Sequence, residues 1–238
     1  MMLGLCIVFV GGLRADVLHT VDFEVDGAGY TQSDDWNPQA SDYFTRIPSG
    51  ATLVDGFEDF SGVSGAFFAI EDSDNLPATP NITTTAIDIS AGYTSFTTTV
   101  SIAATGTQES PDFVNFLYSF NGTDYTLFGS LRGLDPITSS DLHVDADFDG
   151  LGDVSGQAAS GAFSDFSFNF TGSGSQLFVR TEVFISSNEE LGIDDIRVSA
   201  AIPEPTTIGL MGLTSLGVFI FRRKRYRKFK VNSTEMDF

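Results

Sequence analysis

Cysteine and histidine are almost missing from this 238-residue sequence, which has one cysteine and two histidines. Cys6 lies in the apolar run at the N-terminus, so a chain that loses this run has no cysteine. Disulfides, thiolate catalysis and cysteine-ligated zinc are then excluded together. His19 and His143 are not accompanied by a Gly-x-Ser-x-Gly nucleophile elbow, so the sequence gives a Ser-His-Asp hydrolase little support. We expect His143 to be a turn residue or a neighbour of the acids that follow it rather than a base.

Basic residues are also scarce in the central part of the chain. Between residues 16 and 201 there are four arginines against 29 of the 32 acids, which gives a net charge of −25. Such a field repels nucleic acid and anionic lipid, so no nucleic-acid partner is expected. It suits divalent cations, neutral polysaccharide, or simply a solvated acidic surface that keeps the protein soluble.

Strong helix formers are few, whereas phenylalanine and glycine are abundant, with 23 and 24 residues. Aromatic and β-branched residues favour strands, and glycine and aspartate favour turns. Alternation of apolar and polar residues predicts strands over residues 17–25, 96–102, 114–120, 166–170, 177–185 and 193–200. Turn signals such as Asn121-Gly122 and Asp149-Gly150 separate these runs. The pattern predicts an all-β sandwich or barrel.

The apolar run within residues 1–15 is too short to span a bilayer, and small residues precede a plausible cleavage point after Ala15. We interpret residues 1–15 as a signal peptide, although no Lys or Arg precedes the apolar run. A buried first strand is the alternative. The domain that follows is expected to occupy residues 16–200.

A second hydrophobic segment lies near the C-terminus and has three parts. Pro203-Glu204-Pro205 comes first, and residues 208–221 follow without a charge. Seven Lys and Arg residues then lie within residues 222–230. The apolar part predicts a short transmembrane helix, and the basic cluster holds its C-terminal end in the cytoplasm. An ordinary single-span anchor would have the same physical properties.

The order of these three parts over residues 201–230 resembles the PEP-CTERM sorting domain. The resemblance implies an exported protein of a Gram-negative, biofilm-forming bacterium, anchored in the inner membrane as a precursor and processed by exosortase. It also implies that Pro203, Glu204 and Pro205 are the recognition element and that the helix is a transient anchor. Residues 231–238 would be a short cytoplasmic tail. The processed protein would reach the cell surface or the extracellular matrix.

Three pieces of the central domain resemble strands of the jelly rolls found in carbohydrate-binding modules. They are Asp22-Phe23-Glu24, residues 67–72 and residues 191–198. The resemblance implies a jelly-roll β-sandwich ectodomain, followed here by the single transmembrane helix. In such modules an acid near the first strand and an aspartate on the last share a structural calcium ion. By position these would be Glu24 and Asp195.

One acidic motif predicts a calcium loop directly from its spacing. Asp145, Asp147, Asp149 and Asp153 occupy positions 1, 3, 5 and 9, and Gly150 at position 6 permits a sharp turn. Position 12 is a glycine, so a helix-flanked EF-hand is not expected. A solvated acidic turn is the alternative to bound Ca²⁺.

Trp36 is the single tryptophan, and the polar residues around it predict a loop. Tyr30 and Tyr43 flank it, so the three rings are candidates for a sugar-binding platform. The alternative is a tryptophan packed over one end of the core.

These observations favour a non-catalytic exported surface or matrix protein that is stabilised by calcium and associated with exopolysaccharide or biofilm. The first alternative is a carbohydrate-binding, lectin-like module. The second is a secreted glycosidase or other hydrolase, because adjacent acids such as Glu189-Glu190 and Asp194-Asp195 could form a catalytic pair. With 29 acids in the domain such pairs arise by chance, so an enzyme is not expected.

Overall fold

The computed structural model describes residues 15–33, 36–39, 42–48, 60–76, 78–134, 141–186 and 189–201, without the side chains of residues 36–39, 42 and 75. These residues belong to one compact unit, Arg14–Ala201. The predicted signal peptide (except Ala15) and the sorting segment, with Pro203, Glu204 and Pro205, lie outside the described residues. Within the described part of the chain, no helix has the length and apolarity needed to cross a membrane.

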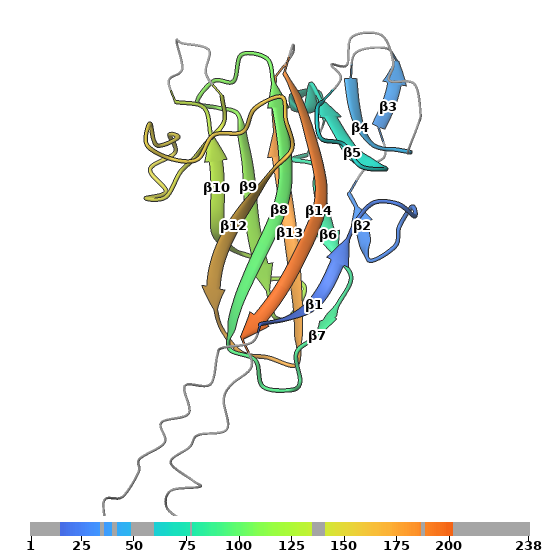
Figure 1. Cartoon of the computed structure of the whole chain (residues 1–238), viewed down its shortest axis with the longest axis vertical. Helices are drawn as coiled ribbons and strands as arrows, with labels where there is room; N and C mark the ends of the chain where they lie inside the picture. The colour runs from blue at the N-terminus through green and yellow to red at the C-terminus, as the bar shows by residue number, and fades with distance from the viewer. Residues whose placement is uncertain are drawn as a thin grey trace, which may run out of the picture. The chain divides into compact units, whose positions relative to one another are not determined.

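Two antiparallel sheets make up the domain (Figure 1). The β8 sheet contains, in spatial order, β12 (Ser164–Thr171), β8 (Ser95–Thr105), β14 (Glu190–Ala201), β5 (Phe67–Glu71), β4 (Asp42–Ile47) and β3 (Trp36–Gln39), with β1 (Ala15–Val21) paired to β14. The β13 sheet contains β11 (His143–Val144), β10 (Thr126–Arg132), β9 (Phe113–Ser119), β13 (Gln176–Phe184), β6 (Asn81–Thr84) and β2 (Tyr30–Gln32), with β7 (Ile87–Asp88) paired to β13. One 3₁₀ turn, Ser73–Asn75, lies between β5 and β6.

The connections between the sheets follow a jelly-roll path. The strands β5, β6, β8, β9, β10, β12, β13 and β14 pass from one sheet to the other at every step except the β9–β10 hairpin. Their spatial orders are β12-β8-β14-β5 and β10-β9-β13-β6. Eight strands wound in this way form two sheets of four, which is the jelly-roll sandwich. The predicted fold class of the ectodomain is confirmed.

The core forms because alternate side chains of each strand point between the two sheets. In β13, for example, Leu177, Val179, Thr181 and Val183 are buried, and the residues between them are partly exposed. Aromatic rings fill much of the interior. Phe44 and Phe68 meet with ring centroids 4.8 Å apart, and Tyr118 and Phe170 stack at 4.6 Å. Because buried and partly exposed residues alternate along β13, its outward side chains lie on the open face of the sheet.

Two predicted elements differ from what the structure shows. The first strand ends at Val21 instead of continuing to Val25, because the chain turns at Phe23, whose φ is 56°. Trp36 was expected in a loop, but its backbone lies in β3 and pairs opposite Phe44 of β4. Hydrogen bonding between these short strands is a tertiary effect that the polar local sequence does not reveal.

Candidate ligand-binding cleft and acidic sites

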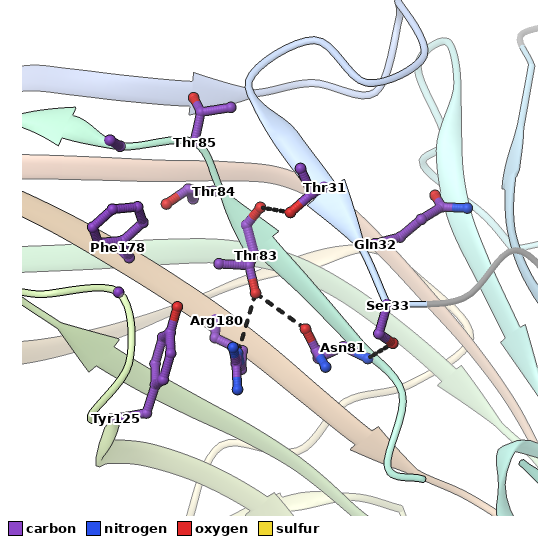
Figure 2. Close-up of a pocket in the computed structure, with 12 residues that line it drawn as sticks. Thr31, Gln32, Ser33, Asn81, Thr83, Thr84, Thr85, Tyr125, Phe178 and Arg180 are labelled. Atoms are coloured by element: carbon purple, nitrogen blue, oxygen red, sulfur yellow. Dashed lines mark hydrogen bonds between the residues drawn. The ribbon is translucent and has the colours of Figure 1, made fainter. Parts of the chain in front are cut away.

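The outer face of the β13 sheet contains a cleft with a volume of about 440 Å³ (Figure 2). Strands β2, β6 and β13 and the turn that joins β9 to β10 supply its lining. The side chains are mainly hydroxyl and amide groups, with Phe178, Arg180 and Tyr125 on one side. The cleft thus combines apolar ring surface with many hydrogen-bonding groups.

The guanidinium of Arg180 is held in a fixed position within this cleft. Its Cζ lies 3.7 Å from the centroid of the Tyr125 ring, and its Nε donates a hydrogen bond to Thr83 Oγ1 at 3.2 Å. Thr83 Oγ1 in turn donates to Asn81 Oδ1 at 3.1 Å. Glu182 on the same strand lies 3.6 Å from Arg180 Nη1. The stack and the hydrogen bonds immobilise the arginine before any ligand arrives.

The Asn121-Gly122 turn predicted from the sequence determines where Tyr125 lies. The Asn121 side-chain oxygen accepts hydrogen bonds from the amides of Thr123 and Asp124, both at 2.9 Å. Gly122 takes a φ of 76°, which favours glycine because it has no Cβ. The turn is therefore well ordered by local hydrogen bonds, and it brings Tyr125 against Arg180.

The outer face continues beyond the cleft toward the other end of the sheet. Phe113 and Phe184 stack there with centroids 5.7 Å apart, and the Arg132 guanidinium lies 4.6 Å from the Phe113 centroid. Between the two aromatic groups, Ser130 Oγ donates to Asn115 Oδ1 at 2.9 Å. The partly exposed face thus has an arginine–aromatic stack near each end and polar groups between them.

The tyrosines predicted for the sugar platform do not lie on this face. Tyr30 is 2% exposed and Tyr43 is 1% exposed, so both rings belong to the core and present no free surface to a ligand. This corrects the expectation for both residues. The Trp36 side chain lies outside the description. The cleft residues Tyr125, Phe178 and Arg180 were missed, although Phe178 and Arg180 occupy the outward positions of a correctly predicted strand.

The predicted calcium loop lies between β11 and β12. Carboxylate oxygens of Asp145, Asp147 and Asp149 lie within 4.8 Å of one another. Asp153 is not in this group. Its Oδ2 accepts a hydrogen bond from the Ala146 amide at 2.9 Å. The structure therefore brings together three of the four predicted acids.

The second predicted calcium pair, Glu24 and Asp195, lies in a group of acids that also contains Asp22 and Asp194. The pKa of Asp194 is raised to about 7, chiefly by burial and also by the charges of Asp195, Glu24 and Asp22. Glu24 Oε1 accepts a hydrogen bond from the Ala66 amide at 2.9 Å. A cation near these acids would offset their repulsion, and calcium at this position stays a prediction.

A third group of acids was missed by the sequence analysis. Carboxylate oxygens of Glu109, Asp112 and Glu189 lie within 4.8 Å of one another, and Asp112 and Glu189 are 0% and 1% exposed. Burial, followed by the charge of Asp112, raises the pKa of Glu189 to about 8. The Ser186 hydroxyl donates to Asp112 at 3.1 Å, and the Ser186 amide donates to Glu189 at 2.7 Å. Glu189 is far from Glu109 and Asp112 in the sequence, so spacing gives no sign of the group.

Three solved structures are similar to this chain. One is the K1 cleaved adhesin domain of Lys-gingipain from Porphyromonas gingivalis, with 12% identity, 78% of this chain and 97% of that chain covered, and a TM-score of 0.42. Another is the CBM22-1 xylan-binding domain from Paenibacillus barcinonensis, with 9% identity, 81% of this chain and 99% of that chain covered, and a TM-score of 0.41. The third is the N-terminal cellulose-binding domain of a Cellulomonas fimi β-1,4-glucanase, with 10% identity, 78% of this chain and 97% of that chain covered, and a TM-score of 0.40.

The sequence itself gives one family match. No curated protein sequence matches the chain. The family description "PEP-CTERM protein-sorting motif" matches residues 201–225, the segment that contains Pro203, Glu204 and Pro205. The resemblance seen in the sequence is confirmed: behind its all-β ectodomain, this chain carries a PEP-CTERM protein-sorting motif.

Proposed function

We propose that this protein is delivered to the cell surface by exosortase and there binds neutral polysaccharide through the cleft on the β13 sheet. The sorting motif indicates an exported protein that is processed at the membrane for the cell surface. The observation that supports binding is the Tyr125–Arg180 stack beside a cleft lined by hydroxyl and amide groups. Delivery and binding are separate parts of the proposal, and each has its own test.

The chemistry of the cleft fits a sugar chain better than an apolar ligand. A pyranose ring has C–H faces that pack on aromatic side chains, and its hydroxyls need fixed donors and acceptors. Phe178 and Tyr125 supply ring surface, and Thr31, Asn81 and Thr83 supply polar groups. The net charge of −25 over residues 16–201 repels acidic polymers, which favours a neutral one.

The residues that line the cleft support binding without catalysis. Glycoside hydrolysis uses two carboxyl groups placed on either side of the scissile bond. Among the described residues that line the cleft there is no aspartate or glutamate. We therefore favour a surface or matrix component that holds exopolysaccharide in a biofilm over a glycosidase or other hydrolase.

Affinity electrophoresis in gels containing neutral polysaccharide tests the binding part of the proposal. Xylan and dextran serve as neutral probes, and alginate serves as the acidic one. The purified protein should be retarded by a neutral polymer and not by alginate. Tyr125→Ala and Arg180→Ala should each reduce the retardation, because each removes half of the stack. Thr126→Ala, an exposed neighbour outside the cleft lining, is the matched control.

Two results would contradict the proposal. One is equal retardation of the unsubstituted protein and of both cleft variants in every neutral gel that binds it. The other is no retardation by any neutral polymer, including polysaccharide purified from the biofilm of the producing strain. Thermal unfolding of each variant shows whether the fold is intact. This readout matters because a loss of binding has meaning only for a folded protein.

A further inference from the structure

Asp145 is the buried member of the acidic loop between β11 and β12. Its side chain is 2% exposed, and its Oδ1 atom has no hydrogen-bond partner among the described residues. The other oxygen, Oδ2, accepts a hydrogen bond from the Gly150 amide at 3.2 Å. A buried carboxylate oxygen without a partner carries its full desolvation cost. The loop therefore holds a strong acceptor that no residue in the described part of the chain satisfies.

The two acids that accompany Asp145 are exposed and lie close to it. Asp147 and Asp149 place carboxylate oxygens within 4.8 Å of those of Asp145 and of each other. Three like charges at this separation repel one another, and a cation between them turns the repulsion into attraction. The chain curls around this point because Phe148 and Gly150 have φ values of 58° and 94°.

We propose that Asp145, Asp147 and Asp149 bind one Ca²⁺ ion, and that Asp153 is not a direct ligand. Calcium takes oxygen ligands only and accepts six to eight of them in a flexible arrangement, so water and backbone carbonyls complete a site with three carboxylates. Mg²⁺ fits less well, because it requires near-ideal octahedral geometry and dehydrates reluctantly. Asp153 lies outside the group of three, and its Oδ2 accepts a hydrogen bond from the Ala146 amide that links the two ends of the loop.

The site is tied to the edge of the β13 sheet. The Asp145 amide donates to Ser130 O of β10 at 3.0 Å, and the Gly152 amide donates to Gly133 O, just after β10, at 3.0 Å. The charge of Asp145 also acts on Arg132 of β10. An ion bound here would stabilise the loop against β10 and β11. This inference does not depend on polysaccharide binding.

Isothermal titration of the purified full chain with Ca²⁺ tests the site, because each bound ion is counted. Asp147→Asn and Asp149→Asn should each lose one ion or bind it more weakly, on the order of tenfold, since affinity in such loops follows the number of charged ligands. Asp153→Asn is the matched control. It removes the same charge from the same loop and keeps an oxygen that can accept from Ala146.

Each result of the titration either supports or contradicts the proposal of three ligands. The proposal predicts that Asp153→Asn binds as many ions, with similar affinity, as the unsubstituted chain. Unchanged calcium binding in both Asp147→Asn and Asp149→Asn would overturn it, as would a full chain that binds no Ca²⁺. A loss in Asp153→Asn equal to that of the other two variants would overturn the assignment of three ligands. Asp147 and Asp149 are exposed, so their substitution leaves the fold intact.

Discussion

The protonation of individual buried carboxyl groups makes the stability of this domain depend on the pH of its surroundings. The pKa of Glu189 is raised from 4.5 to about 8, first by burial and then by the charge of Asp112. The pKa of Asp112 is raised as well, also chiefly by burial. At neutral pH the group formed with Glu109 therefore retains a proton that the unfolded chain would release.

This shift predicts that stability falls as the pH rises. Below about 4.5 Glu189 is protonated in both states, and its contribution to the free energy of unfolding is fully present. Above 4.5 the unfolded chain loses the proton first, so the contribution decreases and is lost as the pH passes about 8. Asp194, with its pKa raised to about 7, acts in the same direction. Urea unfolding in the presence of a chelator, repeated across this range, measures the slope.

Glu189→Gln isolates the contribution of this residue. The variant should show a flatter dependence of stability on pH between about 5 and 8, because a neutral amide replaces the titrating group. Glu182→Gln removes a partly exposed acid that pairs with Arg180 and should keep the original slope. Equal slopes in the original protein and in Glu189→Gln would contradict the assignment.

Among the elements, β10 shows how a strand can depend on a single glycine. The register with β9 shifts between Leu127 and Gly129, which produces a bulge. A Cβ placed on Gly129 would lie 2.6 Å from the Phe168 ring, and Phe168 packs against Phe116 with centroids 4.9 Å apart. Phe168 also contacts Phe128 with ring centroids 6.4 Å apart, so moving its ring aside would disturb the packing of both neighbouring rings.

Gly129→Ala should therefore destabilise the domain by about 1–3 kcal/mol, the usual cost of overpacking. Chemical denaturation of the variant and the original protein under one set of conditions measures the difference. Gly161→Ala is the control, because its Cβ would meet a threonine methyl group at 3.1 Å, outside the aromatic core. A Gly129→Ala variant as stable as the original would show that Phe168 moves freely.

The long strands were predictable, and the short ones were not. β8 and β13 show regular alternation because each has one face in the core over many residues, and β14 does so from Ile196 onward. β3 and β10 break the pattern, the first through its polar sequence and the second through its bulge. The cleft was missed for a related reason: Arg180 and Tyr125 come from different elements, and only the fold brings them together. The acidic loop was found because its aspartates are close in sequence.

At the scale of the whole molecule, charge divides the chain into parts with different destinations. Residues 16–201 are strongly acidic, and seven of the 12 basic residues lie within residues 222–230. The basic cluster resists crossing the bilayer, so the acidic domain is expected outside and the cluster inside. Cleavage at the sorting motif would separate the two.

Sorting can be followed with a tag added after Phe238. We predict that the tag is separated from the surface-exposed domain in a host with a working exosortase, because the sorting motif lies between them. Glu204→Ala should cause full-length, tagged protein to accumulate in the membrane fraction. Immunoblots of surface and membrane fractions measure both outcomes. Tagged, full-length protein as the sole species in that host would identify an ordinary single-span anchor instead.

The position of β14 also has a mechanical consequence. The chain leaves the domain at Ala201, the last residue of β14, and this strand has neighbours on both sides: β8 along one edge, and β5 and then β1 along the other. A pulling force applied beyond Ala201 acts along β14 and strains its hydrogen bonds to these neighbours in parallel. They must then fail together rather than one after another. A polymer bound to the domain under flow would thus pull on β14, which is hydrogen-bonded to neighbouring strands along both edges.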